Sequence, residues 1–176
     1  MSSLVSPERV WWKPLGKDER LWVSIALVWS LILFAMMIIW GGTGKQDVPI
    51  ETYRVKPQQF QQLANGFIEK NRVGTESGIP IVRPPVGSDV YLIARMWQWS
   101  PILELKKGAT YRIHVSSLDL QHGLSIQPGN LNLMALPDYD YVITLTPDKA
   151  GEFQIVCNEF CGQGHHLMTG KIIVTE

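Results

Sequence analysis

Residues 89–117 read DVYLIARMWQWSPILELKKGATYRIHVSS, and from this stretch to the C-terminus the hydrophobic pattern has a period of two. Three short runs show it here, VYLIARMW, ILELKKG and TYRIHVSS, with the turn-forming residues SP and KKG between them. Successive side chains of a β-strand point to opposite faces of the sheet, so this period predicts strands.

Four more runs of the same kind follow, HGLSIQ, YVITLT, FQIVC and GKIIVT, and QPGN, LPDYD, PDKAG and CGQG separate them. Several short strands at such spacing are typical of an antiparallel sandwich or barrel. We therefore expect one all-β domain over residues 89–176.

The preceding residues, 41–88, are rich in Gly, Pro, Gln and Asn. One piece, VKPQQFQQLANGFIEKN, has a Pro that suits a first helical turn, and Phe60, Leu63, Phe67 and Ile68 recur in it at helical spacing. This segment is predicted to be a linker with one short helix, whose apolar face lies on a neighbouring element.

Residues 21–40, LWVSIALVWSLILFAMMIIW, contain no charged residue. At about 1.5 Å per helical residue they span roughly 30 Å, the thickness of a bilayer core. Trp22 and Trp40 stand at the two ends, where indoles favour the interface between lipid and water. A cleaved signal peptide has a shorter apolar stretch, so we interpret residues 21–40 as a single transmembrane helix.

The charges beside this helix predict its orientation. Arg9, Lys13, Lys17 and Arg20 precede it, whereas the residues just after it offer only Lys45. By the positive-inside rule, the N-terminal segment 1–20 is cytoplasmic. The rest of the chain would then lie outside the cell (inner) membrane, which in a bacterium means the periplasm or the cell surface.

Net charge and cysteine number limit the possible functions. Lys and Arg total 16, as do Asp and Glu, so the chain has no basic field to hold nucleic acid. Two cysteines are too few for a disulfide framework. Their CxxxC spacing fits a single disulfide, a metal site or a redox pair.

The stretch CNEFCGQGHHLM, residues 157–168, concentrates soft metal ligands. Cys161, His165 and Met168 form a C-x3-H-x2-M pattern between two predicted strands, and His122 at the head of another strand can supply a second imidazole. Copper sites of the blue type use such a set, because sulfur stabilises Cu(I) while nitrogen tolerates Cu(II). The pattern favours an electron-transfer site.

One thiol, that of Cys157, is left over by a mononuclear copper site. Two thiolates can bridge two copper ions, each of which then takes one histidine and one weak ligand. A disulfide or a structural zinc site would leave His122, His165 and Met168 together unexplained. The residues therefore favour two copper ions.

The motif CxExCGxxHxxM, with DxxHG upstream and a transmembrane helix before it, resembles subunit II of the haem-copper cytochrome c oxidases. That family carries a binuclear copper centre, CuA, in a cupredoxin-like Greek-key β-sandwich, which residues 89–176 would form. The resemblance implies bridging thiolates from Cys157 and Cys161, one histidine ligand per copper from His122 and His165, weak ligation by Met168, and a backbone carbonyl from Glu159.

The same resemblance implies a function for the whole chain. It would accept electrons from a cytochrome c or a small copper protein and pass them to haem in subunit I, where oxygen is reduced. A single helix resembles the B-family oxidases, in which a small helical subunit can replace the missing helix. Members that oxidise quinol have lost the cysteines and histidines, so a cytochrome c donor is favoured.

Two other functions fit the sequence. The CuA subunit of a nitric oxide reductase from the same superfamily would read much the same. A membrane-anchored copper carrier is the other, although a delivery protein needs an exposed site that releases its metal.

Two tryptophans and an aspartate extend the resemblance around the metal. Trp97 and Trp99 alternate onto one face of a predicted strand, where the family has aromatic residues through which electrons enter; ordinary core packing is the alternative. Asp119 resembles an acidic residue near the donor's docking area, or it is a turn residue.

The sequence also suggests a role or a location for Glu19, His166 and His114. Glu19 matches by position a glutamate at the entrance of a proton channel, or it is an interfacial charge. His166 would be a loop side chain or a contact to the catalytic subunit. His114 shares the polar face of its strand and is expected on the surface.

Overall fold

The computed structural model describes residues 14–44, 49, 51–127, 129 and 131–176. Arg9, Lys13 and Lys45, which served to orient the membrane helix, lie outside the described residues. The chain divides into two compact units, residues 1–45 and 46–176.

Among the described residues of the first unit is helix α1 (Lys17–Thr43), which contains the predicted span 21–40. None of its residues is buried, and apolar side chains surround the whole helix rather than one stripe. Such a helix is typical of a membrane span. Ser30 and Thr43 donate their hydroxyls to carbonyls four residues earlier, which satisfies these polar groups without water. Among the described residues, α1 is the one helix long and apolar enough to cross a membrane.

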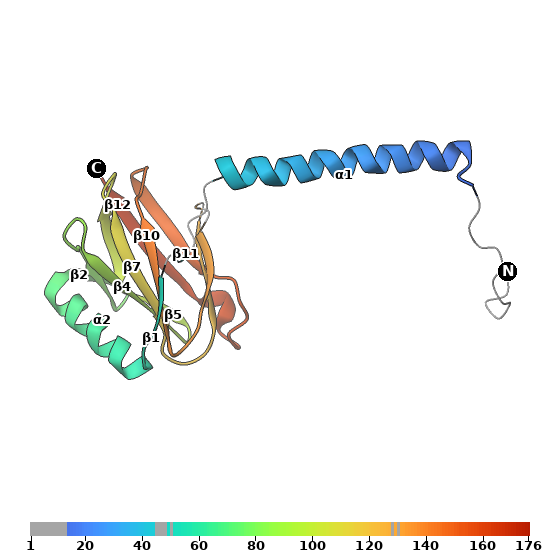
Figure 1. Cartoon of the computed structure of the whole chain (residues 1–176). Helices are drawn as coiled ribbons and strands as arrows, with labels where there is room; N and C mark the ends of the chain where they lie inside the picture. The colour runs from blue at the N-terminus through green and yellow to red at the C-terminus, as the bar shows by residue number, and fades with distance from the viewer. Residues whose placement is uncertain (1–13, 45–48, 50, 128, 130) are drawn as a thin grey trace, which may run out of the picture. The chain divides into compact units, whose positions relative to one another are not determined.

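The second unit is a β-sandwich with one helix (Figure 1). One sheet has the strand order β1-β10-β7-β4-β5, and the other β2-β3-β6-β12-β11-β8-β9. In chain order the elements are β1 (Glu51–Arg54), α2 (Pro57–Asn71), β2 (Arg72–Glu76), β3 (Ile79–Val82), β4 (Asp89–Arg95), β5 (Gln98–Ser100), β6 (Ile102–Lys106), β7 (Tyr111–Ser117), β8 (His122–Gln127), β9 (Leu131–Ala135), β10 (Tyr139–Leu145), β11 (Gly151–Cys157), the 3-10 turn η1 (His165–Leu167) and β12 (Thr169–Thr175).

The core lies between the two sheets and follows from the alternation in the sequence. Leu92 of β4 and Ile113 of β7 point into it from one sheet, and Leu124 of β8 and Ile155 of β11 from the other. Fully burying an aliphatic side chain of this size contributes about 1.5–3 kcal/mol to stability. The predicted sandwich is confirmed.

Helix α2 covers the outer face of the five-stranded sheet at β4 (Figure 1). Phe60 and Ala64 pack there with Ile93, a residue on the side of β4 that faces away from the main core. Leu63, which we expected on the buried face of the helix, is exposed instead.

Three features differ from the sequence-based expectations. The segment expected to be a linker contributes β1, β2 and β3 to the two sheets as well as helix α2. The sheets are mixed rather than purely antiparallel, because β4 pairs in parallel with β7, and β6 with both β3 and β12. Strand β9 falls where we expected only a connection between strands.

The prediction that His114 lies on the surface is wrong. Its ring is 8% exposed and stacks on Tyr91, at 4.8 Å between centroids, and Tyr91 in turn contacts Phe60 of α2. Period two showed correctly that His114 faces away from the main core, but α2 and its neighbours bury that face too. The ring nitrogens lie 2.7 Å from Asp140 and 3.4 Å from Asp89.

These carboxylates give His114 a pH dependence. Burial alone would lower its pKa, yet the hydrogen bond and charge of Asp140, together with Asp89, raise the pKa above its ordinary value. A histidine with a raised folded-state pKa contributes stability that is complete below its unfolded pKa, about 6.5. That stability disappears as the pH rises through the folded-state value.

We therefore predict that the free energy of unfolding of this unit contains a component that falls as the pH rises above about 6.5. Asp140→Asn should remove most of this slope, because it removes the main partner of His114. Denaturant unfolding of the full chain in detergent, followed by tryptophan fluorescence at several pH values, measures it. Asp138→Asn, at an exposed partner of Lys56, should keep the slope. An unchanged slope in Asp140→Asn would refute the assignment to His114.

Candidate metal centre

The topology brings the predicted ligands to one end of the sandwich. Strand β11 ends at Cys157 and lies between β12 and β8, and β8 begins at His122. The loop that follows β11 holds the other predicted ligands and returns to β12 at Thr169. In Figure 1 this loop lies at the end of the sandwich opposite to the C-terminus.

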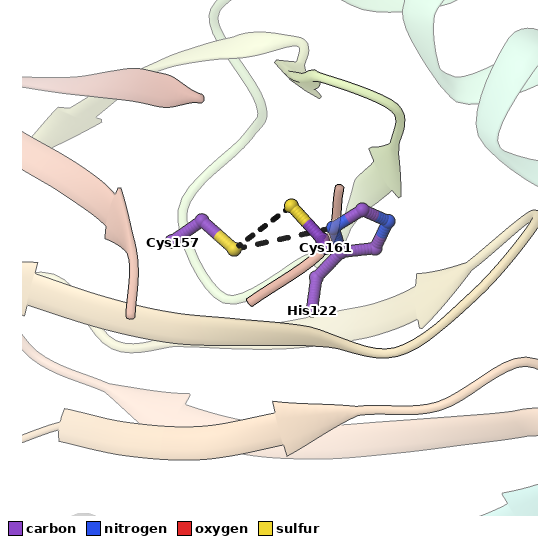
Figure 2. A group of neighbouring side chains, drawn as sticks. All are labelled: His122, Cys157 and Cys161. Carbon is purple, nitrogen blue, oxygen red and sulfur yellow. Dashed lines mark hydrogen bonds between the residues drawn. The ribbon is translucent and has the colours of Figure 1, made fainter. Parts of the chain in front are cut away.

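The two cysteines are free thiols buried beside each other. Their Sγ atoms are 3.7 Å apart. The Sγ of Cys157 is also 3.3 Å from the carbonyl oxygen of Glu159 and 4.0 Å from Nδ1 of His122. Figure 2 shows His122, Cys157 and Cys161 converging, with ligand atoms all within 4.8 Å of one another.

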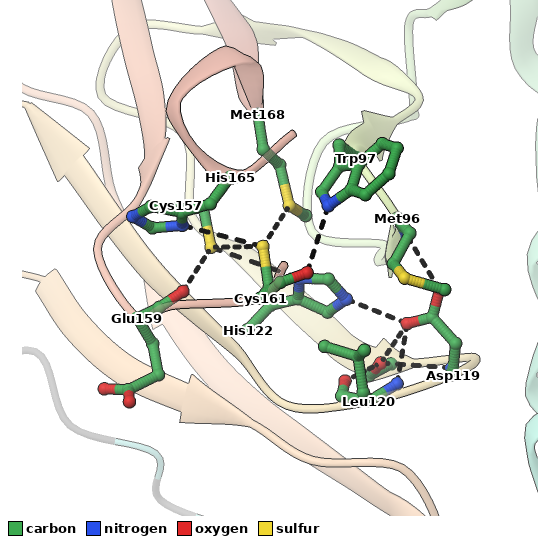
Figure 3. Close-up of polar contacts among 11 residues, drawn as sticks. Met96, Trp97, Asp119, Leu120, His122, Cys157, Glu159, Cys161, His165 and Met168 are labelled. Atoms are coloured by element: carbon green, nitrogen blue, oxygen red, sulfur yellow. Dashed lines mark hydrogen bonds and ion pairs between the residues drawn. The ribbon is translucent and has the colours of Figure 1, made fainter. Parts of the chain in front are cut away.

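The second cysteine has its own neighbours from the loop. Nδ1 of His165 lies 3.6 Å from the Sγ of Cys161, and Sδ of Met168 lies 3.8 Å from it (Figure 3). Met168 is buried, whereas His166, the neighbour of His165 in the sequence, is exposed. The structure thus brings all six predicted ligand residues together.

The surroundings of the two thiols oppose their ionisation in the absence of a bound cation. Burial, and next the hydrogen bond and charge of Cys157, raise the pKa of Cys161 to about 11. A metal ion bound at the thiols reverses such a shift and deprotonates them. Two thiols, two imidazoles, a thioether and a carbonyl are a soft set of donors, which fits copper and does not fit calcium or magnesium.

Close backbone contacts fix the loop. Cys157 N donates to the carbonyl of Met168, and Asn158 N donates to the carbonyl of Gly123. A Cβ atom at Gly123 would lie 2.1 Å from Oδ1 of Asn158 and 2.8 Å from the amide nitrogen of Glu159. The absence of a side chain at Gly123 therefore lets the loop approach β8. The glycine in DxxHG was the available signal for this role, but its spacing alone did not reveal it.

The two tryptophans occupy different environments, contrary to the expectation that they share one strand face. Trp97 precedes β5, is 42% exposed, and donates its indole N–H to the carbonyl of Cys161 at 3.0 Å. Its ring covers Gly164, where a Cβ would lie 2.3 Å from the indole. Trp99 is 1% exposed and meets the ring of His122 edge-on.

Asp119 is an exposed residue whose carboxylate contacts one of the predicted ligands. Its Oδ1 is 2.8 Å from Nε2 of His122, and its Oδ2 accepts the backbone N–H of Met96 at 2.7 Å (Figure 3). Burial would raise the pKa of this carboxyl, but the hydrogen bonds from Met96, His122 and Leu120 outweigh burial and lower the pKa. No sequence pattern indicates the contact with Met96.

Glu19 belongs to the other unit, where it caps α1. Its carboxylate accepts the backbone N–H of Gly16 at 2.9 Å in the first turn. A carboxylate at a helix N-terminus is stabilising. The role at a proton channel stays a prediction.

The chain is similar in sequence to subunits of known oxidases. No protein-family model matches the chain. Cytochrome c oxidase subunit 2 of Thermus thermophilus is 34% identical over 88 residues, which are 49% of this chain and 65% of that protein. A probable cytochrome c oxidase subunit 2 of Streptomyces coelicolor is 34% identical over 164 residues, which are 91% of this chain and 46% of that protein. Each match spans less than two thirds of the relative's own length.

Two solved structures are also similar to the chain. A chain of a heme-copper terminal oxidase dimer is 25% identical, with a TM-score of 0.58 over 90% of this chain and 100% of that chain. Rusticyanin from Thiobacillus ferrooxidans is 17% identical, with a TM-score of 0.51 over 74% of this chain and 100% of that chain. The likeness to rusticyanin concerns the fold alone, and it confirms the cupredoxin-like sandwich.

The close approach at Gly123 yields a prediction. Gly123→Ala should push the loop away from β8, because the new methyl group meets backbone, and overpacking of this kind costs about 1–3 kcal/mol of stability. We expect a lower free energy of unfolding in the metal-free chain and less copper retained after loading. Gly66→Ala is the control, since its methyl group meets open space on helix α2. It should stabilise by up to about 1 kcal/mol. Equal copper retention and stability in Gly123→Ala and the parent chain would contradict this account.

Proposed function

We propose that the chain, which is similar in sequence to subunit 2 of cytochrome c oxidases, is the copper-binding electron-transfer subunit of a membrane-bound haem-copper oxidase. One observation carries the proposal: two buried free thiols lie 3.7 Å apart, with imidazole, thioether and carbonyl donors around them. A mononuclear copper site of the blue type uses only one thiolate.

We assign the residues to a binuclear copper centre of the CuA type. Such a centre takes up and releases one electron at a time. The proposed ligands are the bridging thiolates of Cys157 and Cys161, the Nδ1 atoms of His122 and His165, the thioether of Met168 and the carbonyl oxygen of Glu159.

The chain's own contribution is rigidity. The ligand loop is hydrogen-bonded at both ends, where β11 meets β12 and where Asn158 meets Gly123. Buried donors in a fixed loop change position little when the charge of the site changes, so little reorganisation accompanies electron transfer.

Electrons enter, in this proposal, through Trp97. Its exposed ring can contact a donor. Its indole N–H bonds to the carbonyl oxygen of Cys161, the residue that also provides one of the two thiols. Trp99 is buried and cannot contact a donor, so its proposed role is to pack against the ring of His122. The donor would be a cytochrome c or a small copper protein.

Membrane attachment follows from helix α1, which would anchor the subunit with the β-sandwich on the outer side. The orientation rests on the basic residues before the helix. The partners would be subunit I, which holds the haem and reduces oxygen, and a small helical subunit of the kind found in B-family oxidases. Burial of Cys157, Cys161 and Met168 disfavours a copper carrier, which must release its metal to a partner.

The test uses spheroplasts that contain the native complex, to which reduced soluble cytochrome c is added outside. We expect oxygen consumption that Cys157→Ser abolishes in an assembled complex, because one thiolate cannot bridge. Met168→Leu should keep the copper and slow turnover, since a thioether mainly tunes the redox potential.

Three outcomes would count against the proposal. Oxygen consumption that Cys157→Ser leaves unchanged would remove the copper role. Access of the donor only after permeabilisation would reverse the orientation. Consumption of nitric oxide rather than oxygen would move the subunit to a nitric oxide reductase.

A further inference from the structure

The carboxylate of Asp119 joins two parts of the site that are distant in the sequence. Its Oδ1 bonds with Nε2 of His122, at the start of β8. Its Oδ2 accepts the N–H of Met96, in the turn between β4 and β5. Both contacts are visible in Figure 3, where Asp119 lies between the ring of His122 and the turn at Met96.

The first contact selects the nitrogen that His122 presents to the cysteines. An ionised carboxylate only accepts hydrogen bonds, so Nε2 must carry the hydrogen, and Nδ1 of the neutral ring keeps its lone pair. Nδ1 is the nitrogen that lies 4.0 Å from the Sγ of Cys157. The ring is fully buried, so this carboxylate rather than solvent decides the tautomer.

The second contact reaches the exposed tryptophan. Met96 precedes Trp97, whose indole N–H bonds to the carbonyl of Cys161. A continuous connection therefore runs from His122 through Asp119 and the turn at Met96 to Cys161. The same side chain supports a ligand and the residue assigned to electron input.

Asp119 is itself held firmly. Its Oδ1 also accepts the N–H of Leu120 at 2.7 Å and lies 3.3 Å from the hydroxyl of Ser117. With His122 and Met96, these contacts occupy both oxygens. These contacts hold the carboxylate in place at the surface, and its role in donor docking stays a prediction.

We propose that Asp119 is a positioning residue for the metal centre: it fixes the tautomer and ring orientation of His122 and ties them to the turn that carries Trp97. The proposal deepens the copper function and rests on it. A carboxylate bonded to the far nitrogen of a metal-bound imidazole makes that ligand more basic. Such a ligand favours the more oxidised metal, so loss of the charge should raise the reduction potential.

Asp119→Asn is the informative variant, because it keeps the size of the side chain. Its amide has one acceptor oxygen, and its NH2 group must face either the N–H of Met96 or Nε2–H of His122. One of the two contacts is then lost, and so is the negative charge. Asp138→Asn is the matched control, since Asp138 bonds through its carboxylate to the exposed Lys56.

The full chain in detergent is studied with and without copper. In the metal-free chain with 15N-labelled histidine, NMR should show His122 as the Nε2–H tautomer in the parent and a mixture of tautomers in Asp119→Asn. With copper, Asp119→Asn should have a higher reduction potential and altered His122 nitrogen couplings in electron–nuclear double resonance. Asp138→Asn should match the parent in all three measurements.

The positioning role of Asp119 can be supported or overturned by several results. Loss of copper from a folded Asp119→Asn chain supports the positioning role. An unchanged tautomer, reduction potential and set of couplings in Asp119→Asn would overturn it. Failure of the metal-free variant to fold would overturn it too. So would a variant in which only the donor concentration needed for half-maximal rate changes. A parent chain that binds no copper rejects the copper function, while the NMR measurement still tests the tautomer.

Discussion

The short distance between the thiols of Cys157 and Cys161 is the constraint on which the rest of the site depends. Two cysteines four residues apart come within 3.7 Å only because the loop after β11 folds back on itself. In that position, burial and mutual proximity oppose ionisation, and the pKa of Cys161 rises to about 11. The arrangement is unfavourable for two thiolates alone and favourable for two thiolates around cations.

The surrounding sandwich explains how the chain holds this arrangement. Strand β11 is central, with β12 on one side and β8 on the other, so the ligands before and after the loop are tied to one sheet. Gly123 lets the loop approach β8, and the ring of Trp97 covers it at Gly164. The core beneath supplies the stability that allows buried polar groups at this end.

Much of this could be predicted from the sequence, for identifiable reasons. A hydrophobic pattern of period two indicates a strand whose side chains alternate between two faces of a sheet, as in β7. Soft ligands close together in a short loop indicate a metal site. The failures occurred where a second layer intervened. His114 obeys the period but is buried by α2 and its neighbours. Strands β1 and β2 are too short and polar to stand out from a linker, and β3 is a run of only four residues that contains a proline. The link between Asp119 and Met96 depends on the approach of two turns that no local pattern encodes.

The account's central claim is that this chain holds two copper ions between two thiolates. The most direct test loads the full chain in detergent with copper, counts the metal per chain, and records its electron paramagnetic resonance spectrum. We predict two copper ions per chain and one unpaired electron whose hyperfine pattern shows two equivalent copper nuclei. A single copper ion per chain, with hyperfine splitting from one nucleus, would contradict the claim.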